Sequence, residues 1–266
     1  MSPAGGSHVV AVVEYDGTEY LGFQIQRTGR TVQGELERAV AQLTQRPTRV
    51  TGAGRTDTGV HAKGQVVHFA ALWRHPLPDL QRALNAVLAG DVAITDLREA
   101  PKGFHARFSA RSREYVYTIR NSAVRSPLTA RYAYHHGVPL DAEAMDRASA
   151  CLVGEKDFLP FGWAPRGEKR EPGTLGGDAV TSPGGRGTVR AVHRAQCRRQ
   201  SDLVYVEIEA DAFLRRMVRR VVGNLLLVGS GDLTIDEFAA LLQLKDRRTP
   251  GVAAPAHGLC LLKVNY

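Results

Sequence analysis

A glycine-rich loop that leads directly into an apolar strand constrains this chain more than any other feature. Residues 51–69 read TGAGRTDTGVHAKGQVVHF. Glycine tolerates backbone conformations and close approaches that other residues do not. Residues two apart in an extended chain point to the same side, so we expect the side chains of Arg55 and Asp57 to face one site together. The stretch therefore predicts a charged pair presented at the start of a β-strand.

Taken alone, the same residues favour a structural interpretation. An aspartate in a glycine-rich loop commonly bonds its own backbone in a turn. An arginine two residues away usually forms a surface ion pair worth about 0 to 1 kcal/mol. Other parts of the chain, described below, are what favour a functional role for Arg55 and Asp57 over a structural one.

Composition limits the classes of protein to consider. The 266 residues suffice for one large domain or two modest ones, and 43% hydrophobic and 23% charged residues are typical of a globular protein. No apolar run approaches the roughly 18 residues of a membrane span, and residues 1–10 lack the features of a signal peptide. We therefore expect a cytoplasmic protein without a membrane segment. Cys151, Cys197 and Cys260 are isolated, which predicts neither a disulfide framework nor a metal site.

The positive charge is concentrated in one part of the chain. The formal net charge is +8, and between residues 102 and 131 seven basic residues stand against the single acid Glu114. Tyr115, Tyr117 and Tyr132 are interleaved with them. Cations neutralise phosphates and aromatic rings stack on bases, so this segment indicates a nucleic-acid partner. The basic residues are Lys102, Arg107, Arg111, Arg113, Arg120, Arg125 and Arg131.

The first half of the chain mixes strands and helices. Residues 9–15 predict a strand that ends in the turn Asp16-Gly17, with residues 20–26 returning as its hairpin partner. Thr31 and Pro78 predict the starts of two amphipathic helices. Further strands are expected over residues 65–71 and 92–97. This order favours an α+β fold over a repeating βα pattern.

The second half predicts elements of similar size. Strands are expected over residues 113–120, 188–197, 203–210 and 258–266, and helices from Asp141 to Leu152 and after the capping box of Thr234 and Glu237. Residues 213–228 predict a helix with an apolar stripe on one side and four arginines on the other. The glycine- and proline-rich residues 163–187 predict a flexible surface loop. We place the halves at 1–106 and 107–266. Their strands and helices are of similar size, which hints at a duplicated unit.

Several stretches together resemble the tRNA pseudouridine synthase A family. They include VEYDGTEYLGFQIQ, GAGRTDTGVHAKGQVVHF, FHARFSARSREYVYTI and FLRRMVRRVVGNLLLVG, and they follow the family's order over nearly the whole chain. The resemblance implies two α+β halves related by a pseudo-twofold axis, sharing a mainly antiparallel sheet with helices packed on it and a basic cleft between them. It also implies a homodimer that uses no cofactor or metal and converts uridines at positions 38–40 of the tRNA anticodon stem-loop to pseudouridine.

The resemblance also assigns roles to residues of this chain. Asp57 matches the catalytic nucleophile, and Arg219 matches the arginine that pairs with it and, we expect, keeps it charged. Arg55 matches the arginine that helps to extrude the base or holds a phosphate. Tyr115 matches the tyrosine that stacks on the target base, and Leu261 lies near the apolar wall of the uracil pocket.

A wider set of residues is expected to contact RNA, with two departures from the family's pattern. Phe23 stands where the family often has tryptophan, and Ile25 gives up a phosphate contact that an arginine makes there. The loop before Thr188 is longer than usual. The expected RNA-binding residues are Phe23, Arg107, Arg111, Arg113, Arg216 and Arg220.

Two other functions fit parts of the sequence. Asp57-Thr58-Gly59 is the DTG triplet of aspartic proteases, but those enzymes need two such carboxylates and this chain has one DTG. An RNA-binding protein without chemistry is the second alternative, and it predicts tRNA affinity that survives Asp57→Ala with no product. His61, His68 and His105 lie near the key segments, where we expect them to have structural or RNA-contact roles only.

Overall fold

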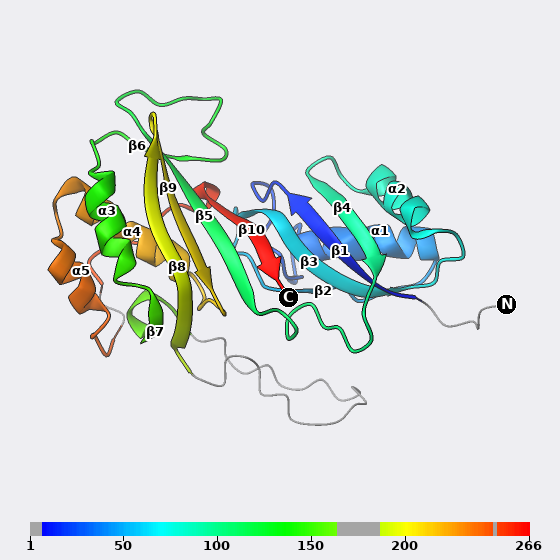
Figure 1. Cartoon of the computed structure of the whole chain (residues 1–266). Coiled ribbons are helices and arrows are strands. Elements are labelled where there is room, and N and C mark those ends of the chain that lie inside the picture. The colour runs from blue at the N-terminus through cyan, green and yellow to red at the C-terminus, as the bar shows by residue number, and fades with distance from the viewer. Residues whose placement is uncertain (1–6, 164–186, 247–248) are drawn as a thin grey trace. The chain divides into compact units, whose positions relative to one another are not determined.

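The computed structural model describes residues 7–163, 187–246 and 249–266 (Figure 1). The predicted flexible loop at 163–187 lies almost wholly outside these ranges. Within them, no helix is long and apolar enough to cross a membrane. The chain forms two compact units, and each is described by itself. The first comprises Met1–Val116, Pro127–Ala133 and Ala256–Tyr266, and the second comprises Tyr117–Ser126 and Tyr134–Pro255.

The first unit is built on a sheet with the strand order β4-β1-β3-β10-β5. Strand β1 lies antiparallel to both β3 and β4, and β10 lies parallel to β3. A short β2 adds to β3 in antiparallel fashion. The bounds are Ser7–Tyr15 for β1, Thr51–Gly52 for β2, His61–Ala71 for β3, Val92–Glu99 for β4, Ser112–Asn121 for β5 and Leu259–Asn265 for β10.

Two helices accompany this sheet, as the sequence predicts. Helix α1, Val32–Thr44, begins after Thr31, whose side chain accepts a hydrogen bond from the backbone of Gly34 at 3.2 Å. Helix α2, Leu77–Val87, packs against β4 and α1. Leu36, Leu80 and Leu84 from the two apolar stripes are fully buried. Their burial fixes the helices on the sheet.

The predicted hairpin partner at residues 20–26 is wrong. Both edges of β1 are already occupied, by β3 and by β4, so no edge is left for a returning strand. The segment instead runs as a loop whose backbone bonds other parts of the first unit. The amide of Phe23 donates to the carbonyl of Thr56 at 3.1 Å, and the amide of Gln33 donates to the carbonyl of Phe23 at 2.8 Å.

The second unit contains a sheet with the order β5-β9-β8-β7, and β6 lies parallel to β5. Helix α3 packs on β8, and α4 contacts both α3 and α5. Strands β8 and β9 pair as predicted. The bounds are Tyr134–His136 for β6, Gly154–Asp157 for β7, Val189–Gln200 for β8, Leu203–Ala210 for β9, Ala142–Ala150 for α3, Met217–Ser230 for α4 and Ile235–Leu241 for α5.

The arginine-rich helix begins later than its sequence predicts. Residues 213–216 are not helical, because Trp163 and Arg215 form a β-bridge in which the amide of Arg215 donates to the carbonyl of Trp163 at 3.0 Å. Arg216 then adopts a left-handed conformation with φ of 62°. Only Arg219 and Arg220 lie on α4, so the four arginines do not share one helix as the sequence predicts.

The chain passes from the first unit to the second inside β5, between Val116 and Tyr117, and its final segment returns to the first unit. The sequence alone placed the division between residues 106 and 107. That division did not foresee that β10, the last strand, would pair with β3.

Candidate active site

The loop at residues 53–60, here called the GRTD loop, holds one buried side chain between two accessible ones. Thr56 is buried, Asp57 is half-buried and Arg55 is exposed. The hydroxyl of Thr56 hydrogen-bonds the hydroxyl of Tyr15 at 2.8 Å. Because neighbours in an extended chain point to opposite sides, Arg55 and Asp57 turn away from the core.

Two fully or nearly fully buried side chains support this loop from beneath. Burial raises the pKa of Tyr15 to about 12, so its hydroxyl stays protonated and able to donate. Gln65 on β3 donates from Nε2 to the carbonyl of Gly54 at 3.0 Å. The loop is thus anchored on both sides of Arg55.

The segment before α1 supports the loop from another side. Gly22 has φ of 89°, and a Cβ there would lie 2.6 Å from the carbonyl oxygen of Thr56. Only glycine fits so close to the loop. The ring of Phe23 is buried, and a Cβ on Gly52 would lie 2.5 Å from it. Phe23 therefore packs under β2, and its contact with RNA stays a prediction.

Tyr115 and Leu261 lie in the same unit as Asp57. Tyr115 is only 8% exposed, and burial raises its pKa. The negative charge of Asp57 raises that pKa further, whereas the charge of Arg113 lowers it, so both charges act on the phenol. Leu261 is buried and stands opposite Ala62 in the parallel pairing of β10 with β3. The fold therefore gathers residues that are far apart in the sequence.

Arg55 lies in a strongly positive environment. Although the residue as a whole is exposed, partial desolvation of its guanidinium lowers the pKa of Arg55, and the charges of Arg107 and Arg49 lower it further. Arg49 also forms a long ion pair of 3.8 Å with Glu37. Like charges that repel one another are stabilised when an anion binds among them, so this group suits a phosphate.

Arg113 has a different setting from the exposed Arg111. Its guanidinium is buried and donates to the carbonyls of Ala53, at 3.0 Å, and of Arg107, at 2.8 Å. It thereby ties the start of the GRTD loop to the segment before β5. The alternation of SREYVY signals this role, because Arg113 shares a face of β5 with the buried Tyr115. A contact of Arg113 or Arg111 with RNA stays a prediction.

The arginines of the second unit make contacts of their own. Arg219 donates from Nε to the carbonyl of Ala254 at 2.7 Å. Arg220 donates to the hydroxyl of Thr249 at 2.9 Å, and its guanidinium lies 5.5 Å from the centre of the Trp163 ring. Arg216 is exposed. The pairing of Arg219 with Asp57 would join residues of different units and stays a prediction.

His61 takes part in a hydrogen-bonded group that sequence reasoning missed. Its Nδ1 accepts from the amide of Gly17 at 2.9 Å, and its Nε2 lies 3.1 Å from the carbonyl of Arg131. Burial lowers its pKa, and the nearby charge of Asp16 opposes that effect. The neutral ring with its proton on Nε2 satisfies both bonds. In the sequence, the only indication that His61 takes part in this group is its position at the start of β3, just after the GRTD loop.

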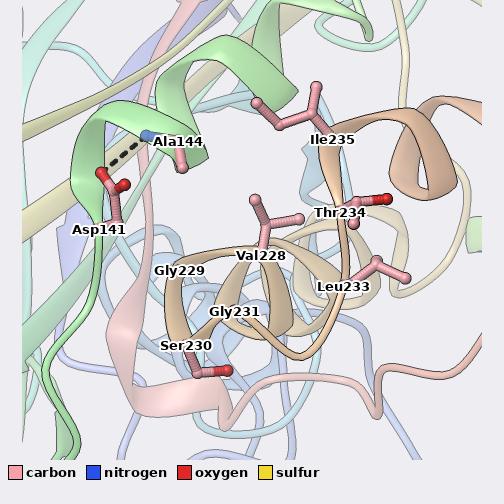
Figure 2. A pocket seen from close by; sticks show the side chains of 9 residues that line it. All are labelled: Asp141, Ala144, Val228, Gly229, Ser230, Gly231, Leu233, Thr234 and Ile235. Atoms are coloured by element: carbon pink, nitrogen blue, oxygen red, sulfur yellow. Dashed lines mark hydrogen bonds between the residues drawn. The ribbon is translucent and has the colours of Figure 1, made fainter.

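A pocket of about 430 Å³ opens in the second unit, away from these residues (Figure 2). It lies where α3 and α5 begin and α4 ends. Its one carboxylate, Asp141, caps α3 by accepting from the amide of Ala144 at 2.9 Å. None of the predicted site residues lines it, so it is not the predicted uracil site. The lining residues are Asp141, Ala144, Val228, Gly229, Ser230, Gly231, Leu233, Thr234 and Ile235.

Known proteins resemble this chain over almost its whole length. The model of a family described as tRNA pseudouridine synthase matches residues 11–109 and 148–266. A protein named tRNA pseudouridine synthase A from Roseiflexus sp. (strain RS-1) is 43% identical over 96% of this chain and 88% of its own length. Proteins of the same name are 40% identical in Geobacillus sp. (strain WCH70), over 97% of this chain and 98% of their own length, and 38% identical in Thermoanaerobacter sp. (strain X514), over 97% and 99%. The chain therefore belongs to the tRNA pseudouridine synthase family and is an isomerase with that family's α+β fold.

Proposed function

We propose that this enzyme converts uridine to pseudouridine at positions 38–40 of the tRNA anticodon stem-loop. It works in the cytoplasm as a homodimer, and the reaction needs neither metal nor cofactor. The observation that carries the proposal is the GRTD loop, which turns Asp57 out of the core while its charge acts on the buried Tyr115. Membership of the family supports the assignment of these two residues.

The reaction needs a nucleophile that can bond and leave again. The bond between C1′ of ribose and N1 of uracil breaks, the base turns, and C1′ bonds to C5. The proton on C5 then leaves and N1, freed from the ribose, takes up a proton, so the product has the same atoms as the substrate. The carboxylate of Asp57 acts as the nucleophile, because a carboxylate forms covalent intermediates that can be displaced. Whether it attacks the ribose or the base is left open.

A uridine in a stem must leave the stack before Asp57 can reach it. Stacking on an aromatic ring returns about 1 to 3 kcal/mol per base, which is comparable with the cost of unstacking. Tyr115 supplies this surface. Because its pKa is raised, the phenol stays neutral, and the charge of Asp57 is not opposed by a phenolate beside it.

Two arginines assist Asp57. Arg55 emerges from the same loop and lies among the charges of Arg107 and Arg49, which suits it to hold a phosphate of the extruded nucleotide. Arg219 pairs with Asp57 and orients its carboxylate. Removing one partner of a buried ion pair typically costs about 3 to 5 kcal/mol, partly because the other charge is left alone.

The test is release of tritium from tRNA labelled at C5 of uridine, followed by mapping of the modified positions. The natural chain should release tritium and form pseudouridine at positions 38–40. Asp57→Asn should do neither and still bind the RNA within a few fold. Asp96→Asn is the matched control, because Asp96 is a half-buried aspartate on β4, as Asp57 is half-buried, and it pairs with Arg98. Turnover by Asp57→Asn, or binding by the natural chain without any product, contradicts the proposal.

A further inference from the structure

The first unit holds one tyrosine whose ring is largely open to solvent in the basic, tyrosine-rich segment. Of the three tyrosines in that segment, Tyr115 is 8% exposed and Tyr117 is 0% exposed, whereas Tyr132 is 52% exposed. Tyr132 lies in Pro127–Ala133, the part of the loop between β5 and β6 that belongs to the first unit (Figure 1). An exposed aromatic ring beside a basic residue suits a base and its phosphate.

Tyr132 is held firmly although it is exposed. Its hydroxyl donates to Oδ2 of Asp16 at 2.9 Å, and the edge of its ring meets the ring of His61, with 5.0 Å between their centres. Arg131 donates to the same Oδ2 at 3.2 Å. Tyr132 is therefore fixed at its hydroxyl and by the contact with His61, and about half of its surface stays exposed.

Asp16 is itself fixed in place. Its Oδ1 accepts hydrogen bonds from the amide of Thr18 at 3.0 Å and from the hydroxyl of Thr18 at 2.6 Å. This is the Asx-turn geometry that an aspartate before glycine favours. Because its own turn holds the carboxylate of Asp16, the side chains of Tyr132 and Arg131 that donate to it are held in place as well.

This group of residues is connected to the GRTD loop. His61, against which Tyr132 packs, accepts from the amide of Gly17 and contacts the carbonyl of Arg131. The residue before it, Val60, donates its amide to the carbonyl of Asp57 at 3.1 Å. Tyr132 is thus linked to the backbone of the proposed nucleophile through its ring contact with His61, the peptide bond from Val60 to His61, and the hydrogen bond of Val60 to Asp57.

We propose that Tyr132 and Arg131 form a second nucleotide contact, in which Tyr132 stacks on an unpaired base of the RNA and Arg131 contacts its phosphate. This inference rests on the proposed function. A ring already fixed in its binding orientation loses little conformational entropy when a base stacks on it. This base is not the target, because the target itself stacks on Tyr115.

The test separates the ring of Tyr132 from its hydroxyl. Binding of an anticodon stem-loop RNA is measured for Tyr132→Leu, Tyr132→Phe and Arg131→Ala, each in an Asp57→Asn background so that turnover does not interfere. Tyr132→Leu should weaken binding about 5- to 100-fold, as loss of one stacked base predicts. Tyr132→Phe keeps the ring and should weaken binding less than threefold.

Arg82→Ala is the matched control for Arg131→Ala. Arg82 is an exposed arginine of the first unit that pairs with Asp79, as Arg131 pairs with Asp16. Loss of Arg131 should weaken binding severalfold and reduce its salt dependence, and loss of Arg82 should change neither. Thermal unfolding of every variant shows whether a binding loss merely reflects misfolding.

Three results overturn the inference. If Tyr132 stacks on a base, Tyr132→Leu binds RNA more weakly than its Asp57→Asn parent, so equal binding excludes the contact. Equal loss in Tyr132→Phe and Tyr132→Leu shows that only the bond to Asp16 matters. A change of oligomeric size with unchanged RNA affinity shows that the segment contacts a second copy of the chain. The proposed function is judged separately, by whether the natural chain forms pseudouridine.

Discussion

The GRTD loop and the arginine-rich residues 213–220 both carry charged side chains that we propose for the site, but these side chains are held in different ways. In the loop, Thr56 bonds the uncharged Tyr15 and the carbonyl of Gly54 accepts from the uncharged Gln65, while the charged Arg113 bonds the carbonyl of Ala53 at the start of the loop. In the arginine-rich segment, Arg219 and Arg220 make the anchoring bonds themselves. In the GRTD loop, mutation can therefore remove a side chain that holds the loop without removing one proposed to act on the substrate. In residues 213–220 the same arginines have both roles.

The largest effect is expected at Gly22. An alanine there would hold φ near 89° and place its Cβ 2.6 Å from the carbonyl of Thr56, so either the loop or its neighbour must move. Gly22→Ala should lower the free energy of unfolding by about 2 to 4 kcal/mol and abolish most activity. Urea denaturation measures the first effect and tritium release the second.

Gly54→Ala is the control for Gly22→Ala. Gly54 lies in the GRTD loop that Gly22 contacts, but a Cβ on Gly54 meets nothing within 4 Å, so Gly54→Ala should lower the free energy of unfolding by no more than about 0.5 kcal/mol. Equal destabilisation by the two variants would show that the close approach at Gly22 does not hold the loop.

The second effect concerns the buried hydroxyl of Thr56. Thr56→Val keeps the shape of the side chain but leaves the Tyr15 hydroxyl without this partner, which should cost about 1 to 3 kcal/mol of unfolding free energy. Because Asp57 follows directly, its carboxylate should shift, and a shift of this kind costs about 10- to 100-fold in kcat. Thr56→Ser should recover most of both losses.

Thr58→Val gives the matched comparison for stability. Thr58 is exposed and lies two residues from Thr56. Thr58→Val should therefore change the free energy of unfolding by less than about 0.5 kcal/mol. If Thr56→Val leaves kcat unchanged while it destabilises the chain, the anchor supports the fold without orienting Asp57.

This comparison also explains what the sequence could predict. Glycines and the alternation of an extended chain are local signals, so the outward turn of Arg55 and Asp57 follows from them. Helix α1 and the capping box at Thr234 are local as well, and both are confirmed. The late start of α4 depends on a bridge from Trp163, which is distant in the sequence and overrides helix propensity.

Other parts of the site were hidden for the same reason. The bond of Thr56 to Tyr15 and the group around His61 join segments that only the fold brings together. Residues 20–26 look like a strand because the turn Asp16-Gly17 precedes them, yet β1 has both edges filled by distant strands. Pairing over long separations is what a single sequence does not reveal.

A third effect tests whether support and charge are combined in Arg219. Arg219→Lys keeps the positive charge but removes the Nε donor, so the carbonyl of Ala254 loses a partner. The expected cost is about 1 kcal/mol of unfolding free energy. If only the positive charge near Asp57 mattered, Arg219→Lys would retain kcat. We expect instead that kcat falls about tenfold, because the lysine side chain is not held in place by the carbonyl of Ala254. Full activity of Arg219→Lys would contradict a role for the anchor.

The smallest effect is expected at Trp163. Trp163→Leu keeps the backbone bridge to Arg215 and removes only the ring that lies 5.5 Å from the guanidinium of Arg220. A cation–π contact of this kind contributes about 0.5 to 1 kcal/mol, and Arg220 keeps its bond to Thr249. Circular dichroism should follow the unfolding, because the substitution removes one of the two tryptophans that report by fluorescence. A loss well above 1 kcal/mol would mean that the ring, rather than the backbone bridge, fixes residues 213–216. The arginine-rich segment would then have a separable anchor, just as the GRTD loop does.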